Sequence, residues 1–198
     1  GSRSYEALMT RIRKLAWTAV AVLALVAAAT GIYRWAATSR PLEQLVAKVG
    51  GPFELTTHEG KRLSSRDLEG KPFAVFFGFT HCPDVCPTTM AELAAIKRAM
   101  GKDGERVQGI FVTVDPERDT PEVLKAYLAA FDPSFVALRG TPEQTADAAR
   151  EFKVFFAKVD GKTPASYTVD HTAGSYVIDT QGQLRLFERY GAPAQELQ

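Results

Sequence analysis

The sequence contains few of the residues that cross-link chains or bind soft metals. Among its 198 residues it has only two cysteines, Cys82 and Cys86, with three histidines and three methionines. This count excludes a scaffold held by several disulfides, and it does not supply the fourth protein ligand that a tetrahedral structural zinc site requires. A disulfide between residues four apart would add only about 2 kcal/mol of stability on the chain-entropy model. The cysteine pair is therefore a candidate for chemistry rather than a staple.

The sequence also lacks an excess of charge of either sign. It has 24 Lys or Arg and 23 Asp or Glu, which gives a formal net charge of +1. Residues 1–40 carry six of the basic residues and one acid, so the remainder has a net charge of −4. A basic footprint for nucleic acid is missing there, and we expect no nucleic-acid partner. No internal repeat or low-complexity segment is present.

One long stretch carries no charge at all. Leu15–Tyr33 is uncharged, with Trp17 near one end and Tyr33 and Trp35 at the other. Its helical length comes close to the hydrocarbon thickness of about 30 Å. The four basic residues that precede it predict that the N-terminus stays inside the cell or organelle. The alternative is a signal peptide cleaved near Ala27–Ala29.

These observations predict four segments along the chain. Residues 1–14 form a cytoplasmic tail that opens with Gly1-Ser2, which resembles an expression scar. Residues 15–37 form a single transmembrane helix, 38–50 a linker and 51–198 one folded domain. The domain then faces the bacterial periplasm or the mitochondrial intermembrane space, where close thiols meet oxidants.

The domain is organised around a strand that runs directly into the cysteine pair. Phe73–Phe79 is an apolar, aromatic run typical of a central strand covered on both faces. Apolar residues at helical spacing follow from about Pro83 or Asp84 until Gly101. Both cysteines are then expected at the N-terminus of a helix, where unpaired N–H groups and the helix dipole lower a cysteine pKa.

The rest of the domain alternates strands with helices. A short hairpin is expected before the cysteines, and an antiparallel hairpin at the end. Two helices are expected to open at Thr120 and Thr141, each followed by proline. The pattern predicts an α/β sheet with parallel pairs. The expected strands span residues 53–55, 62–63, 73–79, 107–114, 135–138, 153–159, 174–178 and 184–190.

The spacing C-x-x-x-C is one residue longer than that of thioredoxin-type oxidoreductases. Residues at i and i+4 share a helix face, so both sulfurs can converge on one ion and can still form a disulfide. Two soft sulfur donors with an imidazole suit copper, and zinc is the common competitor. His81 is a reserve ligand and Met90 a possible soft donor, although a turn residue and a helix-core residue are the simpler interpretations.

His171 is the distant imidazole that we expect to complete the site. The loop over 161–172 can reach the carboxyl end of the cysteine strand, where ligands bind in open α/β sheets. Thioredoxin-type oxidoreductases place a cis-proline at the position that Val169–Thr172 occupies here without one. Asp170 either orients the His171 ring or is an exposed acid that meets a partner.

A carboxylate cluster, Asp115, Glu117 and Asp119, follows the predicted strand over 107–114. It superficially resembles a calcium loop, but the glycine at the sixth position and the glutamate at the twelfth are missing. We therefore expect solvated loop charges next to a helix N-terminus.

Three ordered motifs, GFTHCPDVCPTTM, VTVDPERDTPE and VDHTAGSYVID, resemble the Sco/SenC family of copper-binding assembly factors for cytochrome c oxidase. The resemblance covers about residues 50–191. It implies a thioredoxin-like α/β fold, with Cys82, Cys86 and His171 as ligands of Cu(I), Cu(II) or both. It also implies cytochrome c oxidase subunit II as the acceptor, and other copper chaperones or thiol reductants as partners.

Two functions remain open at this point. A membrane-anchored copper chaperone would deliver copper to the dinuclear CuA centre of subunit II by ligand exchange, without enzymatic turnover. A thiol-disulfide reductase would instead use Cys82 and Cys86 to keep the acceptor's cysteines reduced. A peroxidase-like activity ranks last because a peroxidatic cysteine motif is missing.

Overall fold

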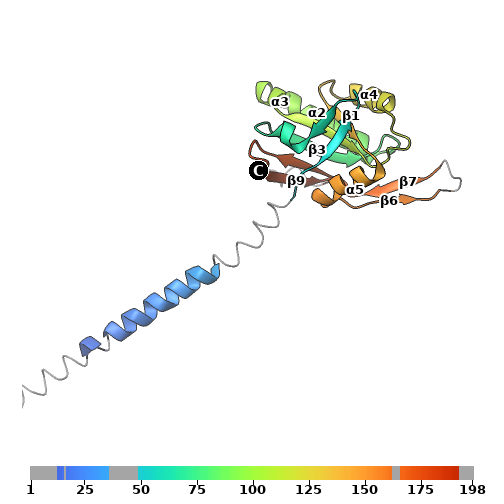
Figure 1. Ribbon diagram of the computed structural model, residues 1–198. Helices are drawn as coiled ribbons and strands as arrows, with labels where there is room; N and C mark the ends of the chain where they lie inside the picture. Colours follow the sequence, from blue (N-terminus) through green and yellow to red (C-terminus); the bar gives the residue numbers. More distant parts are fainter. Residues whose placement is uncertain (1–12, 16, 36–48, 162–165, 192–198) are drawn as a thin grey trace, which may run out of the picture. The chain divides into compact units, whose positions relative to one another are not determined.

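The computed structural model describes residues 13–15, 17–35, 49–161 and 166–191 (Figure 1). The chain divides into two compact units, Gly1–Val46 and Ala47–Gln198. The described residues leave out most of the predicted tail (1–12) and most of the predicted linker (38–48). They also leave out residues 36 and 37.

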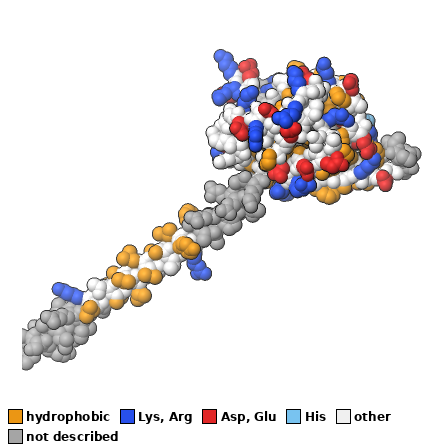
Figure 2. All heavy atoms as spheres, viewed as in Figure 1, with side chains coloured by type: hydrophobic (Ala, Val, Ile, Leu, Met, Phe, Trp, Pro, Cys, Tyr) orange, Lys and Arg blue, Asp and Glu red, His pale blue; other side chains and the backbone are white. Residues whose placement is uncertain are grey.

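The first unit contains a helix, Arg13–Trp35, of 23 residues with a mean hydropathy of 2.1 in its most apolar window. Hydrophobic side chains line it along its length, and basic side chains lie at both ends (Figure 2). All its described side chains are exposed. Within the described ranges it is the only helix long and apolar enough to cross a membrane.

The second unit is built on a seven-stranded mixed sheet in the order β2-β1-β5-β4-β3-β8-β9. The central strand β3 pairs in parallel with β4, and β4 with β5, while β8 and β9 form the antiparallel hairpin at one edge. This is the predicted α/β sheet with parallel pairs. The strands are β1 (Glu54–Thr57), β2 (Arg62–Ser64), β3 (Phe73–Gly78), β4 (Gln108–Thr113), β5 (Val136–Arg139), β8 (Gly174–Ile178) and β9 (Leu184–Arg189).

The helices begin where the sequence places their caps. Thr120 and Thr141 accept hydrogen bonds from the backbone N–H groups of Val123 and Gln144, and a proline follows each of the two threonines. Gly101 follows the cysteine helix as expected, with a positive φ of 56° that favours glycine. The elements are η1 (Ser65–Leu68), α2 (Val85–Ala99), α3 (Lys102–Arg106), α4 (Pro121–Ala129) and α5 (Pro142–Glu151).

Strand β3 is the centre of the hydrophobic core. Every one of its residues is buried, as the apolar run predicted. Phe76 and Phe77 have no exposed surface, and Phe76 packs against Phe111 of β4 with 6.2 Å between ring centroids. Each buried phenylalanine contributes about 1.5–3 kcal/mol through loss of apolar surface to water. The core therefore fixes the strand whose carboxyl end leads into the cysteines.

A second, two-stranded sheet projects from the domain (Figure 1). Strands β6 (Phe156–Val159) and β7 (Thr168–His171) are antiparallel, with Phe156 opposite His171. The predicted loop over 161–172 is therefore wrong in part, because its last residues form a strand. Exposed polar residues at alternate positions of β7 hide the strand pattern, since only Val169 of the four is buried.

Candidate metal centre

The two cysteines lie where the turn after β3 enters α2. The Cys82 N–H donates to the carbonyl oxygen of Phe79 at 3.2 Å, and the helix begins only at Val85. Cys86 is thus in the first helical turn and Cys82 lies just before it, close to the predicted helix start at Pro83 or Asp84. Pro83 gives the physical reason, because a residue that precedes proline disfavours the helical conformation.

The turn nevertheless brings both sulfurs to one point, and the β6–β7 hairpin brings the imidazole. The Cys86 N–H lies 3.4 Å from Cys82 Sγ, and Cys86 Sγ lies 3.4 Å from His171 Nε2. The three possible ligand atoms all lie within 4.8 Å of one another. His81 does not join this cluster, and Met90 is fully buried in the hydrophobic core, as the simpler interpretation of it expected.

The His171 ring is oriented by the backbone rather than by a carboxylate. Its Nδ1 lies 3.1 Å from the carbonyl oxygen of Thr172, which can only accept a hydrogen bond. Nδ1 therefore carries the proton, and Nε2 keeps its lone pair toward the cysteines. Phe76 and Phe79 meet the ring nearly perpendicularly, each with 5.9 Å between centroids. Asp170 is exposed, so of its two predicted roles only the exposed acid fits.

Burial controls the protonation of the site. Cys86 has no exposed surface, and burial raises the pKa of its thiol, although a backbone hydrogen bond from Phe79 opposes this rise. The prediction that the helix N-terminus lowers the pKa is therefore wrong for Cys86, because burial is the largest influence on this thiol and raises its pKa. Burial also lowers the pKa of His171, which favours the neutral imidazole that a metal needs.

Gly78, the last residue of β3, makes room for the sulfur. A Cβ at this position would lie 2.9 Å from Cys86 Sγ and 2.7 Å from the Phe76 ring. Contacts this short force neighbouring atoms to move. Glycine at this position therefore lets Cys86 lie against the end of the strand.

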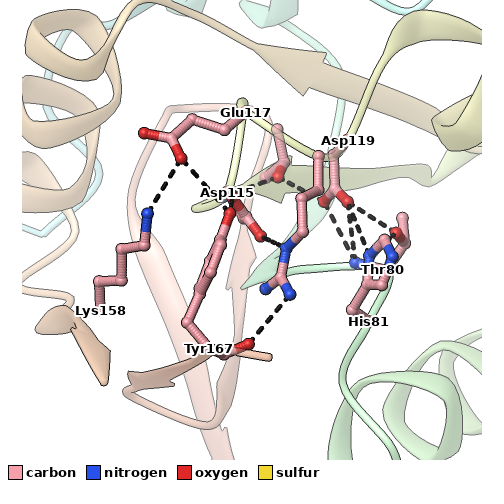
Figure 3. Close-up of polar contacts among 9 residues, drawn as sticks. Thr80, His81, Asp115, Glu117, Asp119, Lys158 and Tyr167 are labelled. Atoms are coloured by element: carbon pink, nitrogen blue, oxygen red, sulfur yellow. Dashed lines mark hydrogen bonds and ion pairs between the residues drawn. The ribbon is translucent and has the colours of Figure 1, made fainter. Parts of the chain in front are cut away.

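Three carboxylates follow β4. Of these, Asp119 is the one connected to the cysteine turn, and it is completely buried. Asp119 accepts hydrogen bonds from the Thr80 hydroxyl at 2.6 Å, from the Thr80 N–H at 3.1 Å and from the Thr113 hydroxyl at 2.6 Å (Figure 3). The exposed His81 ring lies 3.8 Å from it. Asp119 thus joins the segment before Cys82 to the end of β4.

Asp115 is buried as well, and it contacts the hairpin that carries His171. It accepts hydrogen bonds from Arg118 Nε at 2.5 Å and from the Tyr167 hydroxyl at 2.8 Å. Only Glu117 is solvated, where it pairs with Lys158 at 3.1 Å. The prediction of solvated loop charges is therefore wrong for Asp115 and Asp119. Both residues follow the carboxyl end of β4, which lies beside β3. This position in the sequence could have indicated that Asp115 and Asp119 belong to the site rather than to a solvated loop.

The donor set determines what the centre can bind. Two sulfurs and one imidazole nitrogen favour a soft or borderline ion, and copper suits them better than magnesium or calcium. No other Asp, Glu, Cys or His side chain among the described residues joins the three, so a closed four-ligand zinc site is not formed by them. The residues present therefore fit copper, and Cys82 and His171 are only partly buried.

Comparison with known proteins relates this chain to one family. The SCO1/SenC family model matches residues 42–198. An SCO2-like protein of Rickettsia prowazekii is 41% identical over 137 residues, which are 69% of this chain and 67% of that protein. The mitochondrial protein SCO2 of Saccharomyces cerevisiae is 42% identical over 68% of this chain and 46% of its own length.

Comparison with solved structures points to the same family as the sequence comparison. The structure of Bradyrhizobium japonicum ScoI with copper bound superposes with a TM-score of 0.68 and 44% sequence identity, over 75% of this chain and 94% of that one. This match confirms the predicted thioredoxin-like α/β fold. With the family model covering most of the sequence, the chain belongs to the SCO1/SenC family.

Proposed function

We propose that this protein is a membrane-anchored copper chaperone that holds copper through Cys82, Cys86 and His171. It delivers the ion to the CuA centre of cytochrome c oxidase subunit II. The observation that carries the proposal is the convergence of the three donor atoms within 4.8 Å from two separate elements. The copper-bound ScoI of Bradyrhizobium japonicum, which shares the fold, supports it.

The geometry suits transfer by ligand exchange. Copper is the cargo, so it must leave as readily as it enters. Cys82 is only partly buried, whereas Cys86 is fully enclosed. An acceptor thiolate can therefore approach the ion from the Cys82 side while Cys86 still holds it. Transfer of this kind breaks one metal–sulfur bond as another forms and requires no redox step.

The anchor and the location are part of the proposal. The Arg13–Trp35 helix holds the protein in the bacterial inner membrane, or in the mitochondrial inner membrane, with the N-terminus inside. The domain over 51–198 then lies in the periplasm or the intermembrane space, connected by the linker over 38–50. Basic residues before the helix and the length of its apolar stretch support this arrangement.

Copper affinity is expected to rise with pH, because copper displaces a proton from the site. The pKa of the Cys86 thiol is raised, so the thiol is protonated in the free protein across the neutral range. Binding then releases at least this proton, so the affinity rises by about tenfold or more per pH unit. The lowered pKa of His171 delays displacement of a proton from the imidazole until the pH falls below the ordinary value of 6.5. Competition titrations between pH 5 and pH 8 measure this slope, and a pH-independent affinity would contradict it.

A second function, thiol-disulfide reduction of the acceptor, is favoured by one observation. Cys82 and Cys86 are both free thiols, and their sulfurs lie within 4.8 Å. The two can therefore close a disulfide as an acceptor's disulfide opens, with two electrons and two protons passing to the acceptor.

A transfer assay separates the two functions. The copper-loaded full-length chain is mixed with the metal-free, fully reduced CuA domain, the two proteins are separated, and the copper bound to the CuA domain is measured. A chaperone metallates this acceptor. In the second arm, metal-free reduced chain is mixed with the oxidised CuA domain. Reduction of that domain in this arm, with no metallation in the first, would favour the reductase.

A further inference from the structure

The metal centre is assembled from two parts that share no strand pairing. Cys82 and Cys86 follow β3 of the seven-stranded sheet, while His171 belongs to the separate β6–β7 sheet. The distance between the imidazole and the sulfurs therefore depends on the contacts that hold the β6–β7 hairpin. Hydrogen bonds between Phe155 and Thr172 close the base of the hairpin but do not connect it to the cysteine turn.

Arg118 provides such a connection through Tyr167, the residue before β7. Its Nη1 donates to the Tyr167 carbonyl oxygen at 2.9 Å, and its guanidinium carbon lies 3.6 Å from the centre of the Tyr167 ring. Asp115 binds both residues, through Arg118 Nε and the Tyr167 hydroxyl. Tyr167 is thus held at its backbone, its ring and its hydroxyl, four residues before His171 (Figure 3).

The same loop holds the other half of the centre. Asp119, adjacent to Arg118 in the chain, receives three hydrogen bonds, two of them from Thr80, which lies two residues before Cys82. The 115–119 loop therefore contacts the segments that precede both the cysteines and the histidine. The more exposed Lys158–Glu117 pair adds little, because exposed ion pairs contribute at most about 1 kcal/mol.

We propose that Arg118 and Tyr167 are positioning residues: they fix the β6–β7 hairpin so that His171 Nε2 meets the two sulfurs. Without this connection the cysteine pair remains intact but the imidazole moves away. Two thiolates alone still hold Cu(I), a soft ion, whereas Cu(II) depends more on the nitrogen donor. The loop would thus determine which copper oxidation states the site retains, a consequence that rests on the proposed copper chaperone function.

Replacing Arg118 with methionine in the full-length chain tests the proposal. Met fills much of the same volume but cannot donate to Asp115 or to the Tyr167 carbonyl oxygen. In the metal-free protein, amide hydrogen exchange at residues 167–171 is expected to become faster. Cu(II) affinity is expected to fall about 10–100-fold and Cu(I) affinity less than about threefold, with loss of nitrogen hyperfine coupling in the Cu(II) spectrum.

Matched variants separate positioning from general destabilisation. Arg150→Met removes an exposed arginine that also pairs with an aspartate three residues earlier, and it should change nothing. Leu138→Ala truncates a buried side chain of β5 and lowers Tm, but it should leave the ratio of Cu(II) to Cu(I) affinity unchanged. Tyr167→Phe, a mild variant that removes only the hydroxyl, should give an intermediate increase in exchange.

The results distinguish the two proposals. Unchanged hydrogen exchange and an unchanged Cu(II) spectrum in Arg118→Met would overturn the positioning role. Equal falls in Cu(II) and Cu(I) affinity, as expected for the core truncation Leu138→Ala, would also overturn it. If the wild-type chain binds no copper, the chaperone function fails, and hydrogen exchange of the metal-free variants still decides whether Arg118 holds the hairpin.

Discussion

Replacing His171 with alanine is expected to lower Cu(II) affinity by more than about 100-fold. Loss of a residue that only hydrogen-bonds to a metal ligand lowers affinity by about 10–100-fold, and loss of the ligand itself should cost more. The imidazole is the only nitrogen donor of the cluster, and Nε2 already points at Cys86 Sγ from 3.4 Å. Titration of the reduced chain with Cu(II) against a chelator of known affinity measures the change.

His81→Ala is the matched control for this substitution. His81 is adjacent to Cys82 but half-exposed, and its ring contacts Thr80 and Asp119 rather than the cluster. We expect the variant to keep most of the wild-type affinity. Equal affinities in wild type and His171→Ala, together with efficient dithiol exchange, would remove the imidazole from the site and favour the reductase.

Replacing Asp119 with alanine is expected to destabilise the domain by about 3 kcal/mol. The buried carboxylate accepts three short hydrogen bonds, and its removal leaves the Thr80 and Thr113 donors without a partner. For a domain of this size the loss corresponds to a fall in Tm of about 6–12 °C. Thr80 lies two residues before Cys82, so copper affinity should also fall about tenfold. Thermal denaturation of the metal-free chain and the same copper titration measure the two effects.

Two variants are controls for Asp119→Ala: one removes only the charge of Asp119, and the other makes the same substitution at an exposed aspartate. Asp119→Asn keeps the side-chain size and one accepting oxygen, and it should lose only about 1 kcal/mol. Asp147→Ala removes an exposed aspartate that pairs with Arg150, and its effect should stay within about 0.5 kcal/mol. If Asp119→Ala melts at the wild-type temperature, the buried carboxylate does not stabilise the cysteine turn.

The framework of the domain could be predicted because local sequence determines it. The β3 run is apolar at every position, and the caps at Thr120 and Thr141 carry their own hydrogen-bond partners within three residues. The three clustered side chains could also be selected, since sulfur and imidazole are rare in this sequence and the motifs around them are specific. The strand and the caps required no knowledge of long-range contacts, whereas the choice of His171 among three histidines rested on the expected position of its loop and on the family resemblance.

The errors concern groups whose environment is set by distant residues. The raised pKa of the Cys86 thiol arises from complete burial, which a helix N-terminus alone does not reveal. Asp115 looked solvated because its partner Tyr167 lies 52 residues later in the chain. Strand β7 is not evident from the sequence because only Val169 of its four residues is buried, and within the described part of the chain the strand pairs with β6 alone. In each case a tertiary contact outweighed the local pattern.

X-ray absorption at the copper edge of the loaded, full-length chain tests the central claim most directly. The account predicts two sulfur scatterers and one imidazole nitrogen per copper, with the imidazole signal lost in His171→Ala and both sulfurs retained. A first shell of oxygen and nitrogen only, or an imidazole signal that persists in His171→Ala, would contradict it.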